Sequence, residues 1–426
     1  MIGPYIILNF FGRILKMDRT FLKIGYNTSV QAAGKAISVI LSFATIGLLT
    51  RYLGTSGYGN FTLVFSYMSF FSVISDFGLQ LTIVRELTGK NFKEDLYGTF
   101  LWLKIILFFL SMLVEFLFLI FFPYSHTLKI GIIIGGLAVG IGGLSGYGMT
   151  IFQSKVRLDL VTFVDVVTKA ITVALIFLFI FLKFGFYSII STVLLGNLVG
   201  FAVTWILLRR NTPLTFGFNK EIAKKVMMWS LPVGFTSFFS LMYFKLDTIM
   251  LSVIRSSSEV GVYSLAYKIL ENVIVIWAFY MASVYPLLLR FKGENERKFN
   301  KLFKNSFLLA LLSSSIIVTT CFMLSPYLIN IFGGMNFAGS STALRIIIFS
   351  VPFVFINNIF FYHFIMKKNM YPVIFSLIVS LLFNFLANLA YIPKYGYLAA
   401  SYITVVTEFL LFFLLLSFTF LRKRHA

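Results

Sequence analysis

Long apolar stretches alternate with short polar or glycine-containing turns along almost the whole chain. A helix needs about 20 mostly apolar residues to cross the hydrocarbon core of a bilayer. Turns such as "RYLGTSGYGN" and "PKYGY" separate one stretch from the next. The pattern predicts an all-α polytopic membrane protein. Its twelve predicted spans are 27–50, 58–82, 99–122, 131–153, 161–182, 187–208, 226–252, 261–289, 306–325, 344–366, 371–392 and 397–421.

The composition agrees with this pattern. The 426 residues are 59% hydrophobic and 12% charged, whereas soluble domains carry about 25% charged residues. Mean hydropathy is +0.93. Cys321 is the only cysteine, and the three histidines are far apart in the sequence. We therefore expect no disulfide framework and no Cys/His metal site.

The net charge of +21 follows the predicted sides of the membrane. If the twelve spans alternate in direction, 25 of the 36 Lys and Arg residues lie on the side of the N-terminus, five on the other side and six inside spans. Basic residues gather on the cytoplasmic side of membrane proteins. We predict a multi-pass protein of the cytoplasmic membrane with both termini in the cytoplasm, and no nucleic-acid partner.

Two segments of the chain are similar at an offset of 202 residues. The stretch "TSGYGNFTLVF" at 55–65 aligns with "SSEVGVYSLAY" at 257–267, which pairs Gly59 with Gly261. The segments are six spans apart, an even number, so equivalent helices run in the same direction. This predicts two six-helix lobes related by an axis along the membrane normal. The predicted division is a cytoplasmic or interfacial lead-in at 1–26, a first lobe at 27–210, a cytoplasmic linker at 211–225, a second lobe at 226–421 and a basic cytoplasmic tail at 422–426.

Charged side chains inside spans are the first candidates for function, because ionised groups at bilayer depth are costly unless they face a partner or water. Gln31 and Lys35 lie on a polar stripe of the first span, and Asp76 lies at a similar depth late in the second span. We predict an ion pair between Lys35 and Asp76, or a cytoplasmic gate that they share. A helix-packing salt bridge without a role in transport is the alternative.

The second lobe carries a mixed set of charges. Lys245 and Asp247 lie late in one span, and Lys268 and Glu271 lie three residues apart on one face of the next. Ammonium groups that line a cavity of low dielectric would attract an anionic headgroup. The alternative is an intramembrane pair that only neutralises itself.

Two further acids, Glu115 and Glu408, lie in the middle of spans and are candidates for coupling to a proton or sodium gradient. Beyond such an ion, we predict no cofactor, no metal site and no catalytic residue. Asn384 and Asn388, one helical turn apart, are predicted to form interhelical hydrogen bonds. The run "GIIIGGLAVGIGGLSGYG" lacks the Lys-Ser/Thr of a phosphate-binding loop, and it predicts close helix packing instead.

One motif carries a family resemblance. The first predicted hairpin contains Leu53-Gly54, Tyr58-Gly59, Asp76-Phe77-Gly78 and Arg85-Glu86. With these steps the chain resembles the polysaccharide (O-antigen type) flippases of the multidrug/oligosaccharidyl-lipid/polysaccharide exporter superfamily. The motif covers a short part of the chain, while the likeness in length and in number of spans covers nearly all of it.

The resemblance implies two lobes around a central cavity and a substrate that is a lipid-linked oligosaccharide on polyprenyl diphosphate. The transporter would flip this substrate across the cytoplasmic membrane by alternating access, for surface polysaccharide synthesis. Its expected partners are membrane lipid and polysaccharide polymerase or assembly proteins. An ion-coupled exporter of small molecules from the same superfamily is the alternative. A membrane polymerase or ligase is a third hypothesis, but the long outer loop with Arg or His expected of such an enzyme is not found, so we predict that the chain is not an enzyme.

Overall fold

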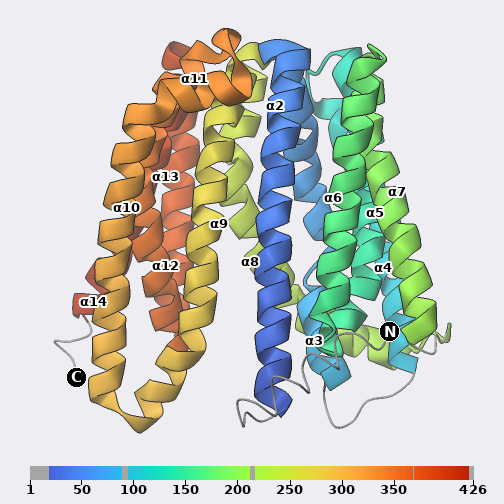
Figure 1. Cartoon of the computed structure of the whole chain (residues 1–426), viewed down its shortest axis with the longest axis vertical. Helices are drawn as coiled ribbons and strands as arrows, with labels where there is room; N and C mark the ends of the chain where they lie inside the picture. The colour runs from blue at the N-terminus through green and yellow to red at the C-terminus, as the bar shows by residue number, and fades with distance from the viewer. Residues whose placement is uncertain (1–18, 89–94, 212–215, 368, 422–426) are drawn as a thin grey trace. The chain divides into compact units, whose positions relative to one another are not determined.

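The computed structural model of the protein describes residues 19–88, 95–211, 216–367 and 369–421 (Figure 1). All regular secondary structure of these residues is helical. Most of the predicted lead-in, part of the linker and the basic tail at 422–426 lie outside the described residues. The helices are α2 (Arg19–Asp76), α3 (Leu79–Thr88), α4 (Asp95–Phe121), α5 (His126–Ser154), α6 (Leu158–Phe181), α7 (Phe186–Asn211), α8 (Lys220–Ile254), α9 (Ser257–Glu294), α10 (Glu296–Gly333), η1 (Met335–Phe337), α11 (Ala338–Ile347), η2 (Ile348–Ser350), α12 (Val351–Met366), α13 (Tyr371–Tyr395) and α14 (Tyr397–Leu421).

Helix α2 is two helices joined at a sharp break. Its 58 residues would extend to about 87 Å in a straight helix, roughly three times the thickness of a hydrocarbon core. Gly54 divides it, with φ 65° and ψ −172°, a backbone conformation that glycine adopts without a steric penalty. Among the described residues, 11 apolar helical segments are long enough to cross a membrane. Because the first of them is this broken helix, they supply about twelve crossings, which confirms the predicted all-α polytopic fold.

Side-chain caps mark where several of these helices begin. Ser125 accepts a hydrogen bond from the backbone N–H of Leu128 at the start of α5. Asn295 does the same for Lys298 at the start of α10, and Asn219 Oδ1 accepts from two backbone N–H groups in the first turn of α8. Such caps satisfy donors that the first turn of a helix leaves without partners.

The described chain divides into two compact units that do not coincide with the predicted lobes. Unit 1 comprises the residues up to Thr45 and Met68–Phe239, and unit 2 comprises Ile46–Tyr67 and the residues from Ser240 onward. The chain around the Gly54 break therefore groups with unit 2, and the first half of α8 groups with unit 1. The boundaries of the two lobes, and the central cavity between them, stay predictions.

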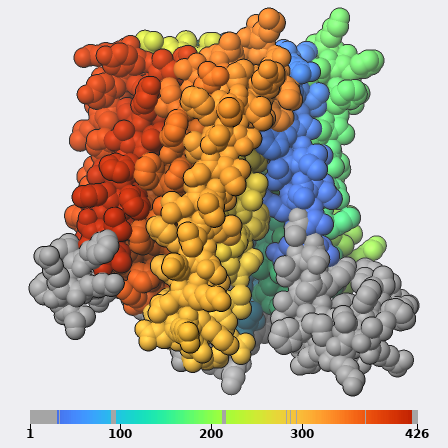
Figure 2. Space-filling view, turned by 60° about the vertical axis from the view of Figure 1, so that its left-hand side comes forward, coloured from blue at the N-terminus to red at the C-terminus, as the bar shows by residue number. Residues whose placement is uncertain are grey.

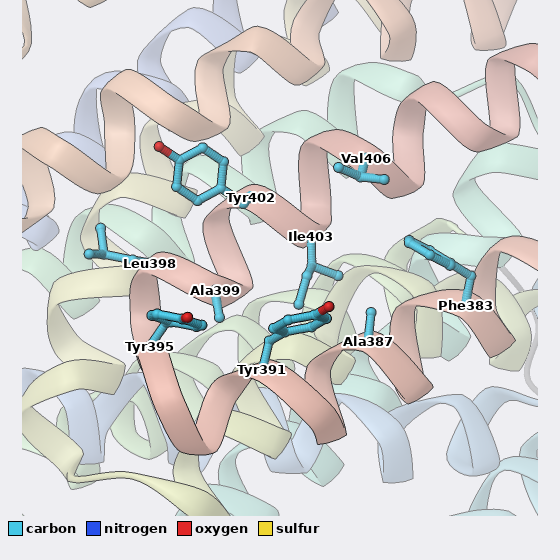
Figure 3. A pocket seen from close by; sticks show the side chains of 9 residues that line it. All are labelled: Phe383, Ala387, Tyr391, Tyr395, Leu398, Ala399, Tyr402, Ile403 and Val406. Atoms are coloured by element: carbon cyan, nitrogen blue, oxygen red, sulfur yellow. The ribbon is translucent and has the colours of Figure 1, made fainter.

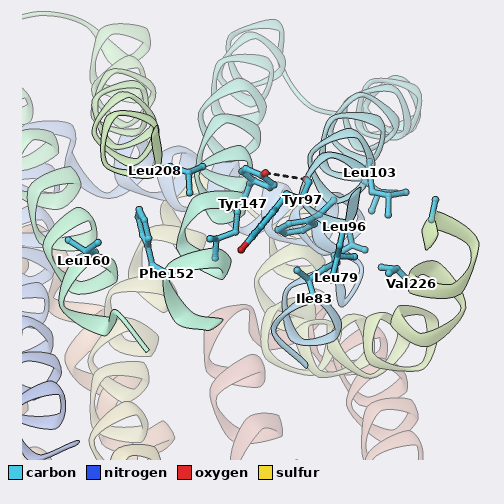
Figure 4. Close-up of a cluster of buried hydrophobic side chains, with 14 residues drawn as sticks. Leu79, Ile83, Leu96, Tyr97, Leu103, Tyr147, Phe152, Leu160, Leu208 and Val226 are labelled. Carbon is cyan, nitrogen blue, oxygen red and sulfur yellow. Dashed lines mark hydrogen bonds between the residues drawn. The ribbon is translucent and has the colours of Figure 1, made fainter. Parts of the chain in front are cut away.

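Unit 1 has a buried apolar core contributed by α3 to α8 (Figure 4). The rings of Phe100 and Tyr147 pack at a centroid distance of 4.9 Å, and the Tyr147 hydroxyl donates a hydrogen bond of 3.1 Å to the Tyr97 carbonyl oxygen. A buried phenol needs such a partner, because an unsatisfied polar group in an apolar core is costly. The core fixes the helices that carry the polar groups of this unit.

In unit 2, the repeat-related glycines contact each other. The Cα of Gly59 lies against the backbone of Ser257 and Gly261, and the Cα of Gly261 lies against the backbone of Thr55 and Gly59. Ser258 Oγ also donates to Thr55 Oγ1 at 2.8 Å. Since Ser257 is the equivalent of Thr55 at the 202-residue offset, the contact is reciprocal, as a two-fold relation between the repeats would give.

The outward face of the helices is apolar, as lipid contact requires. Helix α10 forms much of the face in front in Figure 2, in orange, and exposes Leu308, Leu312, Ile316 and Met323. Helix α4 exposes Phe109, Leu113, Phe116 and Phe121 in unit 1. A surface of this kind fits the hydrocarbon of a membrane and not water.

Candidate functional site

Unit 2 contains a cluster of two lysines and one glutamate. Lys245 on α8 and Lys268 on α9 both bind Glu271, with Nζ–O distances of 2.5 and 2.7 Å. The sequence-predicted pair Lys268–Glu271 therefore forms, and Lys245 joins it. The side chain of Lys268 is 44% exposed, and those of Lys245 and Glu271 are 23% and 24% exposed. Two ammonium groups and one carboxylate give the cluster a formal charge of +1, and all three side chains are partly exposed.

Asp247 lies two residues after Lys245 and has different neighbours. Its side chain is buried, and its carboxylate accepts hydrogen bonds from Asn388 Nδ2 at 2.6 Å, Thr404 Oγ1 at 2.8 Å and the Tyr263 hydroxyl at 3.0 Å. Asn384 Oδ1 in turn accepts from Asn388 at 3.0 Å. The predicted interhelical role of the two asparagines is confirmed, because Asn388 links α13 to α8 and Asn384 Nδ2 donates to Thr407 Oγ1 of α14 at 3.4 Å.

Glu408 forms a second buried acid site in unit 2. Its carboxylate accepts from the Tyr243 hydroxyl at 2.9 Å and from Asn357 Nδ2 at 3.0 Å. These contacts bring together α8, α12 and α14. Among the described residues, neither Glu408 nor Asp247 forms an ion pair with Lys or Arg. Carboxylate and hydroxyl oxygens are ligands for a small hard cation or sites for a proton, so both acids suit a cation better than an anionic headgroup.

In unit 1, Asp76 binds Lys104 and not the predicted Lys35. The Nζ–Oδ1 distance is 2.5 Å, with the Lys104 side chain 3% exposed and that of Asp76 34% exposed. The prediction of a Lys35–Asp76 pair is therefore wrong. Depth along a span can be estimated from sequence, but the lateral order of helices cannot, and Lys104 of α4 is the neighbour. A lone lysine in a predicted apolar span was the available signal, because such a group requires a partner.

Lys35 and Gln31 lie on the first limb of α2, which packs against α6. Ser38 Oγ donates to Asp165 Oδ2 at 2.7 Å, and Lys169 Nζ binds the same oxygen at 2.9 Å. Lys35 is half-buried and Gln31 is exposed. The limb of α2 that carries Lys35 and Gln31 therefore packs against α6.

The Asp-Phe-Gly step ends α2 and turns the chain into α3. Phe77 and Gly78 have φ of 40° and 78°, and the backbone of Gly78 lies against Ser230 and Gly234 of α8. A Cβ at residue 78 would lie 2.7 Å from the Ser230 carbonyl oxygen, so the close approach also requires glycine. Asp76 is therefore the last residue of the helix, next to a tightly packed turn.

Glu115 of α4 is buried against the glycine-rich helix α5. A Cβ at Gly136 would overlap both of its carboxylate oxygens. The backbone of Gly140 lies against Phe108, and that of Gly148 against Thr204. The predicted role of the glycine run in close helix packing is confirmed.

A cavity in unit 2 lies between α13 and α14 (Figure 3). Its volume is about 540 Å³, and its lining contains no Lys, Arg, Asp or Glu. Its residues are Phe383, Ala387, Tyr391, Tyr395, Leu398, Ala399, Tyr402, Ile403 and Val406. The chemistry of this groove suits an apolar chain and not a charged headgroup. Among the residues that the structure describes, no group of three or more His, Cys, Asp or Glu side chains could hold a metal ion.

The sequence matches a known family over more than half of its length. The profile of the family described as "Polysaccharide biosynthesis protein" matches residues 24–292. The chain belongs to this family. A second profile, MatE, matches residues 232–390. No curated protein matches the sequence.

Solved structures share the fold of this family member. One is an inward-facing multidrug resistance MATE family transporter of the MOP superfamily, with TM-score 0.72, 17% identity, and 90% of this chain and 94% of that chain covered. The lipid II flippase MurJ in an inward closed conformation has TM-score 0.71 and 15% identity, with 91% of this chain and 87% of that chain covered. A third is a MOP superfamily transporter from Pyrococcus furiosus, described as having a binding pocket of reverse polarity. It has TM-score 0.67 and 16% identity, with 94% of this chain and 95% of that chain covered. The predicted membership of this exporter superfamily is confirmed, and the chain is a multi-pass membrane transporter of it.

Proposed function

We propose that this protein flips a lipid-linked oligosaccharide, carried on a polyprenyl diphosphate, across the cytoplasmic membrane by alternating access. The observation that carries the proposal is the cluster of Lys245, Lys268 and Glu271. Two ammonium groups around one carboxylate retain a positive charge at bilayer depth, where electrostatic attraction to a diphosphate is stronger than in water. The family match to polysaccharide biosynthesis supports a glycan substrate.

The same cluster explains how a headgroup would be released. Each lysine already has a partner in Glu271, so a diphosphate exchanges one ion pair for another and does not meet a bare ammonium. This lowers the net gain on binding. A transporter needs such a compromise, because a headgroup that is held too tightly is not delivered to the other leaflet.

We propose that a sodium or proton gradient drives the cycle through buried acids. Asp247 and Glu408 support this role, because each has neutral hydrogen-bond donors and no Lys or Arg partner among the described residues. Loading with one cation would neutralise each carboxylate. Glu115 in unit 1 is a third candidate for the same coupling.

The orientation and partners belong to the same proposal. The excess of Lys and Arg on the side of the N-terminus supports both termini in the cytoplasm. Polysaccharide polymerase or assembly proteins would receive the flipped substrate. No catalytic step is assigned to this chain.

A second candidate is ion-coupled export of a small molecule. The MatE match over residues 232–390 and the two buried acids of unit 2 favour it. An exporter of cations would have an acid-dominated binding site, whereas the accessible cluster here is basic. That difference favours the glycolipid.

The test uses the full chain in liposomes that contain a fluorescent lipid-linked oligosaccharide, with flipping measured by access of a membrane-impermeant lectin. The double variant Lys245→Gln/Lys268→Gln is expected to flip at least about tenfold more slowly, equivalent to about 1.4 kcal/mol. Lys169→Gln is the matched control, since Lys169 also binds a carboxylate, 2.9 Å away, but lies in unit 1. Equal rates in the double variant and wild type, or dye export without glycolipid flipping, would contradict the proposal.

A further inference from the structure

The hairpin of α9 and α10 in unit 2 carries a dense group of basic side chains around its turn. Each of the two helices has 38 residues and is therefore about 57 Å long, whereas the hydrocarbon core of a bilayer is about 30 Å thick. The hairpin lies in front in Figure 2, with its turn at the lower end. Within residues 290–304 there are six Lys or Arg residues and two Glu residues. The turn end of the hairpin is therefore strongly basic and extends beyond the lipid hydrocarbon.

This end of the hairpin is firmly packed. The rings of Phe299 and Phe303 stack with a centroid distance of 5.9 Å, and both pack against an apolar core that includes Met366 of α12. Lys292 Nζ of α9 donates a hydrogen bond of 2.8 Å to the Met366 carbonyl oxygen. Contacts with α12 therefore hold both helices in place, and the remaining basic side chains project from a defined surface.

Three basic residues of α10 have no acidic partner within the described chain. Arg297, Lys301 and Lys304 are exposed and form no salt bridge with any described residue, whereas Arg290 binds Glu294 at 3.1 Å. Arg297 lies in the first turn of α10, where positive charge is unfavourable next to the N-terminal end of the helix dipole. Neither ion pairing among the described residues nor the helix dipole therefore accounts for these charges.

The same three residues share a helix face with apolar side chains that are exposed to lipid. Steps of three or four residues, which keep to one face of a helix, connect Arg297, Lys301, Lys304, Leu308 and Leu312. Leu308 and Leu312 are 46% and 62% exposed. Lys304 lies four residues before Leu308, about 6 Å along the axis, and the headgroup region of a bilayer adds about 5–8 Å on each side of the hydrocarbon. The face therefore changes from apolar to basic at the depth of the headgroup phosphates.

We propose that Arg297, Lys301 and Lys304, the basic face of α10, bind the phosphate groups of anionic phospholipids in the adjacent leaflet. Basic residues close to an anionic lipid surface each strengthen binding to it, and guanidinium and ammonium groups donate charge-assisted hydrogen bonds to phosphate oxygens. The acyl chains of the same lipids would contact Leu308 and Leu312. With the termini in the cytoplasm, as the distribution of basic residues predicts, this leaflet is the cytoplasmic one.

The position of the basic face suggests what the lipid would do. Helix α9 carries Lys268 and Glu271 of the lysine cluster, and its last turns form the hairpin with α10. Bound anionic lipid would restrain the turn end of this hairpin at the membrane surface. The lipid composition of the leaflet would therefore influence the helix that carries the cluster. This effect on transport rests on the proposed function, whereas the lipid site itself does not.

The test measures thermal unfolding of the purified full chain in detergent with added phospholipid. Phosphatidylglycerol, which is anionic, and phosphatidylcholine, which is zwitterionic, are compared with the same acyl chains and at low salt. Phosphatidylglycerol is expected to raise Tm by at least about 2 °C more than phosphatidylcholine does. Sodium chloride at about 0.5 M should remove most of this difference, because it screens exposed charges.

The triple variant Arg297→Gln/Lys301→Gln/Lys304→Gln should lose at least about half of the difference between the two lipids. The concentration of phosphatidylglycerol that gives half of the remaining shift should rise about fivefold or more for each charge removed. A change of stability that is common to both lipids cancels in this comparison. Lys301→Arg/Lys304→Arg preserves the charge and should keep the whole difference, which separates the loss of charge from a change in folding.

The matched control is Arg210→Gln/Lys220→Gln/Lys224→Gln. It removes three exposed charges that are predicted on the same side of the membrane but lie in unit 1, and it should respond to the two lipids as wild type does. Equal responses of the α10 triple variant and wild type, or equal losses in both triple variants, would overturn the site. A wild type that responds equally to the two lipids would also overturn it and would leave the basic face to an acidic protein. These measurements contain no oligosaccharide-linked lipid, so a failure of the proposed function would leave their result unchanged.

Discussion

The two units treat intramembrane charge differently. In unit 1, Lys104 binds Asp76 and Lys169 binds Asp165, one cation to one carboxylate. Each of these pairs has no net charge. The Lys104–Asp76 pair joins α4 to α2, whereas Lys169 and Asp165 both lie on α6. Neutral pairs of this kind offer little to a charged ligand.

In unit 2, by contrast, the charges are separated. Lys245 and Lys268 share Glu271, while Asp247 and Glu408 accept hydrogen bonds from neutral donors only. The cluster of Lys245, Lys268 and Glu271 has a formal positive charge, and the two acids have no cationic partner among the described residues. Because retained charge in a low-dielectric region is costly, the difference fits the ligand roles proposed for these groups of unit 2 and a structural role for the two ion pairs of unit 1, whose buried Glu115 remains a separate candidate.

Residues 46–67 belong to unit 2 and contact α9 through Gly59 and Gly261. Breaking this contact has the largest expected effect. Gly261→Val would place a branched side chain against the backbone of Thr55 and Gly59, which cannot move aside as a flexible side chain can. We expect almost no monodisperse protein after extraction, measured by size-exclusion chromatography, and Gly47→Ala should behave as wild type. Normal yield and stability of Gly261→Val would show that residues 46–67 do not depend on this contact.

The pair in unit 1 gives the next largest effect. Asp76→Asn would leave the Lys104 ammonium, 3% exposed, without a carboxylate, and removal of one partner of a buried pair costs about 3 kcal/mol. The double variant Asp76→Asn/Lys104→Met should recover most of this stability, measured by thermal unfolding. It should also flip substrate at a rate near that of wild type. Loss of flipping in a stable double variant would give the pair a role in transport and weaken the contrast between the units.

The sequence predicts contacts between residues that are near each other in the chain better than contacts between separate helices. Hydropathy located the long helices, although α10 extends well beyond its predicted span of 306–325 because polar residues continue a helix outside the apolar core. The Lys268–Glu271 pair follows from helical spacing alone. The Asp76–Lys104 pair does not, because it depends on which helices are neighbours.

The acid sites of unit 2 show the same limit. Glu408 stood out as a lone acid in an apolar span, but its partner Tyr243 is 165 residues away in sequence. Tyrosines are common in this chain, which has 21 of them, so none is distinguished by type. The structure selects Tyr243, Tyr263 and Thr404 because packing brings their hydroxyls to a carboxylate.

The smallest predicted effect tests whether Glu408 is ionised. Tyr243→Phe removes a hydrogen bond to this carboxyl group, and Tyr147→Phe removes a buried hydrogen bond to a neutral carbonyl in unit 1. A hydrogen bond to a charged group contributes about 1.5–3 kcal/mol and one between neutral groups about 1 kcal/mol. If Glu408 is ionised, Tyr243→Phe should cost about 1 kcal/mol more than Tyr147→Phe in thermal unfolding at high pH without sodium. If Glu408 carries a proton or a cation under these conditions, the two costs should be equal. Equal losses of unfolding free energy in the two variants, at high pH and without sodium, would show that Glu408 does not carry a negative charge. Asp247 would then be the remaining candidate in unit 2 for binding a cation.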